Sequence, residues 1–226
     1  MDIEVLVRDE LAEARAYGVL IPVTVRQTTD GKTYVICYPE VEDAVRAVLA
    51  EGGEPLLADT ISKLIVACTP FAKQYGYTPE PYDIHYQYVV YEMDAPQMPV
   101  MAANVEVRQI TEEDFTKFPT ATDFLPYFPN QRMVGVFEDG SIVSVAAENP
   151  YAPEGTAELQ VTTGEAYRGK GYAAAAVSLL TRILFADGID YICYHAPSDN
   201  AASIHVAEVA GFTRAAEYYP ILCYIS

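Results

Sequence analysis

A glycine-rich turn between an apolar, strand-like run and a helix-like run is the feature that most constrains this chain. The turn, Tyr167-Arg-Gly-Lys-Gly171, follows the run 159–163 and precedes an alanine-rich run that ends near Ala186. A strand–turn–helix unit of this kind directs several unpaired backbone N–H groups toward one point, where the helix dipole adds partial positive charge. Glycine also lets a ligand approach the backbone closely. The sequence therefore predicts a site for a phosphate or pyrophosphate group at this turn.

Two classes of phosphorylated ligand fit such a turn, and the first is a dinucleotide. Gly169, Gly171 and Ala174 satisfy the loose pattern G-x-G-x-x-G/A. The full pattern also requires an acidic residue at the end of the next strand, where it binds the ribose. The next strand-like run, 191–196, contains no acidic residue, and Asp199 comes only in the loop that follows. The dinucleotide is therefore disfavoured.

The second class is an acyl-coenzyme A, and two motifs favour it. The first motif, Arg168-x-x-Gly171-x-Ala173, resembles the pyrophosphate loop of the GNAT superfamily of N-acyltransferases. The second motif lies downstream, where Asn200-Ala-Ala-Ser203 begins a helix-like run that closes with Gly211-Phe212. It resembles the Asn-x-x-Ala/Ser…Gly-Phe segment of the same superfamily. Either motif alone could arise by chance, whereas both in this order favour the GNAT superfamily.

Two further runs extend the resemblance over about residues 100–226. The run 158–161 resembles the strand that precedes the pyrophosphate loop, and the run 104–114 resembles the opening strand and helix of the superfamily. The resemblance implies an α/β fold of the α+β type, with a mixed sheet flanked by helices. It also implies that two neighbouring strands, 158–163 and 191–196, splay apart.

The resemblance implies acetyl-CoA as the acyl donor, and we expect no metal. The residues that it implies for cofactor binding lie on the strand, the loop and the downstream helix. They are Leu159, Gln160, Val161, Arg168, Gly169, Lys170, Gly171, Tyr172, Ala173, Asn200 and Ser203.

Transfer of an acyl group to an amine requires a base, because an ammonium group cannot attack a carbonyl. The candidates are His195, whose ordinary pKa suits the task, and Glu158 on the strand before the loop. Each also has a structural interpretation, as a partly buried histidine bonded to a carbonyl or as a solvated carboxylate. His205 is expected to pack or lie on the surface, and His85 lies in the N-terminal half. In the superfamily a tyrosine on the downstream helix often protonates the departing thiolate, but the matching residue here is Ala207.

A stretch rich in proline and alanine, 96–103, predicts a linker between two domains. We expect an N-terminal α/β domain at 1–95, whose role the sequence does not indicate, and a GNAT-like acetyltransferase domain at 104–226. Within the latter, a segment with three prolines carries the aromatic residues Phe124 and Tyr127-Phe128. These could line an acceptor pocket or fill a gap in the core.

Periodicity predicts the elements of the N-terminal domain. Apolar residues at helical spacing predict a helix over 3–17. Two more helices are expected at 40–50 and 56–68, the latter ended by Pro70. The run 84–92, with aromatic residues at alternate positions, is expected to form a strand.

Composition limits the partners. The net charge of −18 over 226 residues argues against nucleic acid. It either attracts a cationic acceptor or keeps the surface hydrated. No apolar run is long enough to cross a membrane, and the N-terminus lacks the basic start of a signal peptide. The four scattered cysteines fit a reducing compartment. We therefore expect a cytoplasmic protein with no membrane partner, either a monomer or a homodimer.

Three functions remain open. The first is an N-acetyltransferase that acts on a primary amine of a small molecule. The second is a non-catalytic acyl-CoA-binding protein or sensor, which the alanine at position 207 makes reasonable. The third is a protein N-terminal or lysine acetyltransferase. The additional N-terminal domain favours the first function, because a small acceptor often requires a lid.

Overall fold

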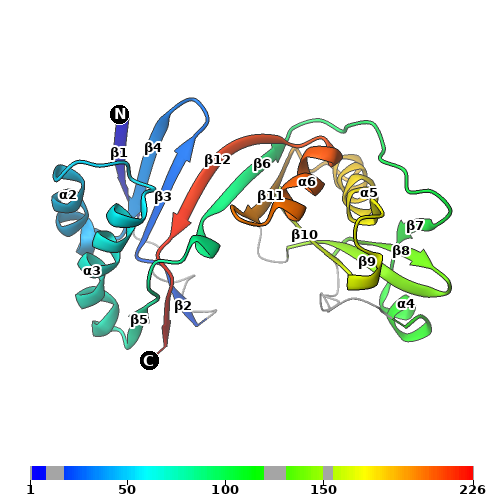
Figure 1. Ribbon diagram of the computed structural model, residues 1–226, viewed down its shortest axis with the longest axis horizontal. Helices are drawn as coiled ribbons and strands as arrows, with labels where there is room; N and C mark the ends of the chain where they lie inside the picture. Colours follow the sequence, from blue (N-terminus) through cyan, green and yellow to red (C-terminus); the bar gives the residue numbers. More distant parts are fainter. Residues whose placement is uncertain (1, 9–17, 120–130, 150–154, 226) are drawn as a thin grey trace. The chain divides into compact units, whose positions relative to one another are not determined.

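The structure is a computed structural model, and Figure 1 shows the course of the chain. It describes residues 2–8, 18–119, 131–149 and 155–225. None of the helices within these ranges combines the length and the apolar character needed to span a bilayer. The aromatic residues at 124, 127 and 128, which could line an acceptor pocket or fill a gap in the core, lie outside the described residues.

The chain forms two compact units. The first consists of Met1–Val90, Pro197–Asp199 and Ala215–Ser226, and the second consists of Tyr91–Ala196 and Asn200–Arg214. This division differs from the predicted boundaries at 95 and 104. The reason is strand pairing, because the C-terminal end of the chain pairs with strands from the N-terminal part.

The first unit contains a sheet covered by helices. Its strands run in the order β1 (Asp2–Val7), β4 (Lys32–Cys37), β3 (Val23–Thr28) and β12 (Thr213–Pro220). Strands β1 and β4 are parallel, whereas β3 is antiparallel to both β4 and β12. A second sheet contains β2 (Val19–Leu20), β13 (Cys223–Ile225) and β5 (Tyr77–Pro79). The remaining elements are η1 (Pro39–Val41), α2 (Glu42–Ala50), α3 (Ala58–Gln74) and η2 (Ile84–Tyr86).

Three predictions for this unit were wrong in part. Residues Asp2–Val7 form strand β1 and not the start of a helix, because Ile3 and Val5 pack on the core while the strand pairs with β4. The rest of that predicted helix, 9–17, lies outside the described residues. Helix α3 continues through Pro70 to Gln74, and the buried Phe71 and Ala72 beyond the proline stabilise its last turn. The predicted strand at 84–92 begins with η2, and only its second part forms β6.

The second unit is built on a mixed sheet flanked by helices, as the resemblance implied. The strands run in the order β6 (Tyr88–Met93), β11 (Tyr191–Pro197), β10 (Thr156–Thr163), β9 (Ser141–Glu148), β8 (Met133–Glu138) and β7 (Glu106–Gln109). Of β6, only the part from Tyr91 onward belongs to this unit. The helices are α4 (Glu112–Lys117), α5 (Tyr172–Ala186) and α6 (Ala201–Ala210), with a short η3 (Glu165–Tyr167) before α5. Strands β7, β8, β9 and β10 pair with one another in antiparallel order, whereas β10 and β11 are parallel.

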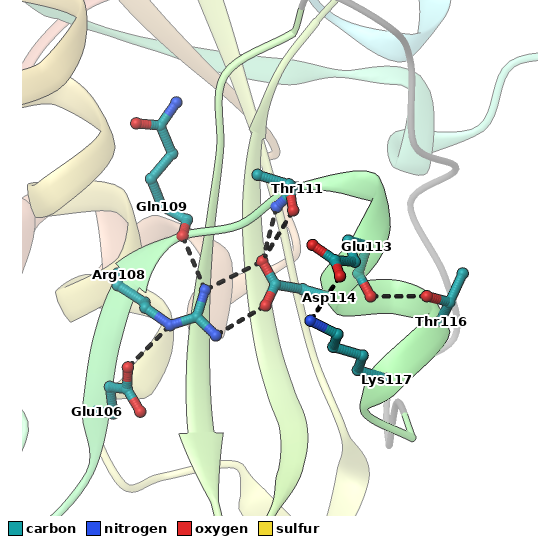
Figure 2. Close-up of polar contacts among 8 residues, drawn as sticks. All are labelled: Glu106, Arg108, Gln109, Thr111, Glu113, Asp114, Thr116 and Lys117. Carbon is teal, nitrogen blue, oxygen red and sulfur yellow. Dashed lines mark hydrogen bonds and ion pairs between the residues drawn. The ribbon is translucent and has the colours of Figure 1, made fainter.

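Helix α4 is fixed to strand β7 by one arginine (Figure 2). The guanidinium of Arg108 donates two hydrogen bonds to the carboxylate of Asp114, at 2.8 and 3.0 Å. The same carboxylate accepts the backbone N–H of Thr111 at 2.9 Å, which completes a capping box at the start of the helix. Arg108 also lies over the ring of Phe137, 4.2 Å from its centroid. These contacts stabilise a helix of only six residues.

Strands β10 and β11 splay apart, as the resemblance also implied. They pair in parallel only from Thr156 to Leu159 on β10 and from Tyr191 to Tyr194 on β11. The rest of β10, from Gln160 onward, pairs with β9 alone among the described strands. The two strands therefore separate after Leu159 and Tyr194, and the unpaired end of β10 leads through η3 to the glycine-rich loop.

Candidate functional site

A cavity of about 510 Å³ lies where the two strands diverge. It is bordered by the end of β10, the glycine-rich loop, the first turn of α5 and one side of α6. The predicted cofactor residues among its lining are Val161, Arg168, Gly169, Gly171, Tyr172, Ala173, Asn200 and Ser203. Leu159, Gln160 and Lys170 are predicted residues that do not belong to this lining.

The backbone of the loop is compatible with an anion site. Gly169 and Gly171 have φ values of 77° and 78°, in the left-handed region that favours glycine. Gly171 is the N-cap of α5, and the first helical bond runs from the N–H of Ala175 to its carbonyl at 3.1 Å. The amides before Ala175 therefore have no acceptor within the helix.

The space in front of the loop suits a pyrophosphate group. A Cβ atom added at either glycine would meet no atom within 4 Å, so the protein leaves open space at both positions. The first turn of α5 contains no acidic residue that would repel an anion. Arg168 lines the cavity and donates from Nε to the carbonyl of Thr163 at 3.4 Å, which keeps its positive charge near the loop. The residues present thus fit the phosphates of coenzyme A.

The start of α6 forms the opposite wall. The side-chain oxygen of Asn200 accepts the backbone N–H of Ser203 at 3.0 Å and caps the helix. The hydroxyl of Ser203 lies 2.8 Å from the hydroxyl of Tyr194 on β11. His205, for which a surface or packing role was expected, is part of the cavity lining together with the apolar Val206.

Tyr194 is a cavity residue that the motifs did not indicate. Its side chain is buried, and this burial raises the pKa of its hydroxyl despite the opposing effect of the hydrogen bond between Tyr194 and Ser203. A signal was present in the sequence, because alternate residues of this strand, Ile192 and Ala196, are apolar and buried on the same side. The position facing the cavity could therefore have been inferred from the alternation.

The two candidate bases lie side by side. Nδ1 of His195 is 3.4 Å from a carboxylate oxygen of Glu158, and their side chains are 23% and 29% exposed. Because side chains alternate along a strand, both lie on the face opposite to Leu159 and Tyr194. From the sequence these residues were alternative candidates for the base, whereas the parallel register of β10 and β11 brings their side chains together.

Ala207, the residue at the tyrosine position of the superfamily, is fully buried in α6. Its methyl group can neither donate nor accept a proton. Within the described parts of the chain, no group of three or more histidine, cysteine, aspartate or glutamate side chains is placed to hold a metal ion.

Comparisons with known proteins agree with this geometry. A family model described as an acetyltransferase (GNAT) domain matches residues 90–213, more than half of the chain. The match begins at the division between the two units, and the N-terminal unit before it is not recognised. A search of curated proteins found no match.

Among solved structures, a putative GNAT acetyltransferase from Novosphingobium aromaticivorans aligns with a TM-score of 0.50 and 22% identity, over 66% of this chain and 73% of its own. A GCN5-related N-acetyltransferase from Kribbella flavida aligns with a TM-score of 0.47 and 16% identity, over 90% of this chain and 68% of its own. The first of these likenesses supports the fold. Proteins with a GNAT domain transfer an acyl group from acetyl-CoA. On the family model, the chain belongs to the GNAT acetyltransferase family.

Proposed function

We propose that this protein is an acetyl-CoA-dependent N-acetyltransferase whose acceptor is a primary amine of a small molecule. The observation that carries the proposal is the position of the Glu158–His195 pair. It lies on the two strands that diverge at the cavity, next to the last paired residues, Leu159 and Tyr194. Beyond these residues β10 and β11 do not pair with each other in the described parts of the chain, so a group held in the cavity can face an amine beside the pair.

The loop would hold the donor by its pyrophosphate. The backbone N–H groups of Gly169, Gly171, Tyr172 and Ala173 supply donors at the start of α5, and Arg168 supplies a positive charge. The backbone of β10 from Leu159 to Val161 would orient the remaining arm of the donor, because this strand loses its partner on the β11 side there. Acetyl-CoA supplies the acyl group when it is bound.

His195 would take the proton from the acceptor amine. A neutral imidazole can accept this proton at neutral pH, and the resulting imidazolium lies 3.4 Å from the carboxylate of Glu158. The carboxylate would stabilise that positive charge and hold the ring in one orientation. We therefore assign the role of base to His195 and the role of orienting partner to Glu158.

Tyr194 would be the proton donor on the opposite face. Burial raises the pKa of its hydroxyl, so the group keeps its proton at neutral pH. It borders the cavity next to Ser203, whereas the buried Ala207 has no proton to give.

We also place the protein in the cytoplasm, where the buried free thiols of Cys37 and Cys68 would stay reduced.

Release of CoA thiol distinguishes the proposed function from its alternatives. The full chain is incubated with acetyl-CoA and either a panel of small amines or a panel of peptides, and the free thiol is measured. Release that depends on a small amine supports the proposal, whereas release with peptides alone indicates a protein acetyltransferase. CoA binding in calorimetry without release in either panel indicates a sensor. His85→Ala serves as the control for His195→Ala, because His85 lies in the first unit and bonds to Asp199.

A further inference from the structure

Lys170 is the residue of the glycine-rich loop, Tyr167–Gly171, that does not line the cavity. Its Nζ lies 3.0 and 3.1 Å from the two carboxylate oxygens of Glu138, at the end of strand β8. The ammonium also lies 5.0 Å from the ring centroid of Tyr167 and 5.5 Å from that of Tyr172. Lys170 is absent from the lining of the cavity, although it is 42% exposed. Its side chain is therefore held by the protein.

Glu138 binds the loop at a second position. The hydroxyl of Tyr172 donates to the same carboxylate at 3.0 Å. Tyr172 is the first residue of α5, is buried, and borders the cavity. A single carboxylate thus bonds to the residues immediately before and after Gly171.

The two bonds to Glu138 limit the conformational freedom of the glycine-rich loop. Two glycines with positive φ give the loop a large conformational freedom in the absence of side-chain contacts, and that freedom opposes ligand binding. Bonds at positions 170 and 172 restrict the backbone between them to one conformation. A site that is already in its binding conformation loses less entropy when the ligand binds.

We infer that Glu138 is a positioning residue for the acyl donor: it holds the pyrophosphate loop in its binding conformation through Lys170 and Tyr172, and Lys170 itself does not contact the donor. This inference rests on the proposed function. The charges agree with it, since Lys170 lowers the pKa of Glu138 and Glu138 raises the pKa of Lys170. Both groups are therefore charged at neutral pH, and the carboxylate beside the anion site is neutralised.

Calorimetry of CoA binding to the full chain tests the inference. We expect Glu138→Gln to weaken binding about tenfold, the loss expected for hydrogen bonds to a charged group that pre-organise a site. The control is Asp139→Asn, which removes the same charge from the same turn. Asp139 is exposed, and asparagine tolerates its φ of 50°. Because Asp139→Asn changes only the long-range field, we expect it to change the affinity less than about twofold.

Two further variants distinguish positioning from direct contact. If Lys170 acts through Glu138, Lys170→Met and the double variant with Glu138→Gln should bind CoA about as weakly as Glu138→Gln alone. The loss for Glu138→Gln should also be the same with 3′-dephospho-CoA, which keeps the pyrophosphate group. Additive losses in the double variant would show that Lys170 contacts the donor and would overturn the inference.

The outcomes separate the inference from the proposed function. If the wild-type chain does not bind CoA, the proposed function fails. If it binds CoA and Glu138→Gln binds as tightly as Asp139→Asn, the inference fails and the proposed function stands. Should Glu138→Gln not fold, as judged by circular dichroism, Tyr172→Phe removes one bond alone. We expect that variant to bind CoA about threefold more weakly, and an unchanged affinity would overturn the inference.

Discussion

The ion pair between Arg108 and Asp114 provides a quantitative test of the second unit. The carboxylate of Asp114 is 13% exposed and accepts two bonds from Arg108 and one from the backbone of Thr111. The hydrogen bonds from Arg108, which outweigh the effect of burial, lower the pKa of Asp114 from 3.8 to about 2. We predict that Asp114→Asn, which keeps the shape and removes the charge, destabilises the protein at neutral pH.

The size of the effect follows from the pKa. A shift of just under two pH units, at 1.36 kcal/mol for each unit, corresponds to about 2 kcal/mol of stability. Because the folded-state pKa lies below the unfolded-state value, this contribution is fully present above about pH 4. It is lost as the pH falls toward about 2, where the folded state also becomes protonated. The difference between wild type and variant should therefore shrink over that interval.

Urea unfolding followed by circular dichroism at pH 7 and at pH 3 measures the difference. Glu113→Gln is the control, because Glu113 lies on the same helix, is 70% exposed and pairs with Lys117. It should lower the free energy of unfolding by less than about 0.5 kcal/mol at either pH. An equal destabilisation by Asp114→Asn at both pH values would refute the electrostatic argument and leave only a loss of shape or capping.

Three further predictions concern the site. His195→Ala should lower kcat about a hundredfold at pH 6.5, and the loss should shrink toward pH 9 as the amine loses its proton unaided; equal turnover for His195→Ala and the control His85→Ala across this range would exclude the assigned base. Gly171→Glu should abolish the rise in melting temperature that CoA gives the wild type, since it strains the backbone and places a negative charge at the anion site; a retained rise would exclude this loop. Tyr194→Phe should lower kcat by at most about a hundredfold without changing CoA affinity. An unaltered kcat would indicate that water, and not Tyr194, protonates the departing thiolate.

The helices that border the cavity were predictable because their signals are local. Helix α5 begins after Gly171 and α6 ends at Gly211, and Gly211 adopts the positive φ that helix C-termini favour. The alternation of buried residues in β10 and β11 is equally local, so the strands on either side of the loop were also placed correctly. The order of strand, loop and helix therefore followed from the chain itself.

Where distant pairing decides the structure, local signals failed. Asp2–Val7 has apolar residues that fit a helix and also fit a strand, and only the parallel register with β4 selects the strand. At Pro70 the loss of one backbone bond is offset by residues of α3 that are buried on both sides of the proline, such as Leu64 and Phe71. Whether a residue is buried in the tertiary core depends on residues that are distant in the sequence. The local sequence around Pro70 therefore does not show that the helix continues.

Pairing between distant segments also explains why the motifs did not indicate some side-chain contacts at the site. Lys170 was predicted to bind the cofactor from its place in the motif, and its bond to Glu138, 32 residues away in a hairpin that carries no motif, could not be inferred there. Glu158 and His195 were rival candidates until the parallel register of β10 and β11 placed them 3.4 Å apart. A motif identifies the backbone that an anion can use, because that property belongs to consecutive residues. The side chains that orient the loop and move the proton come from separate strands, so only the assembled sheet shows which of them act together.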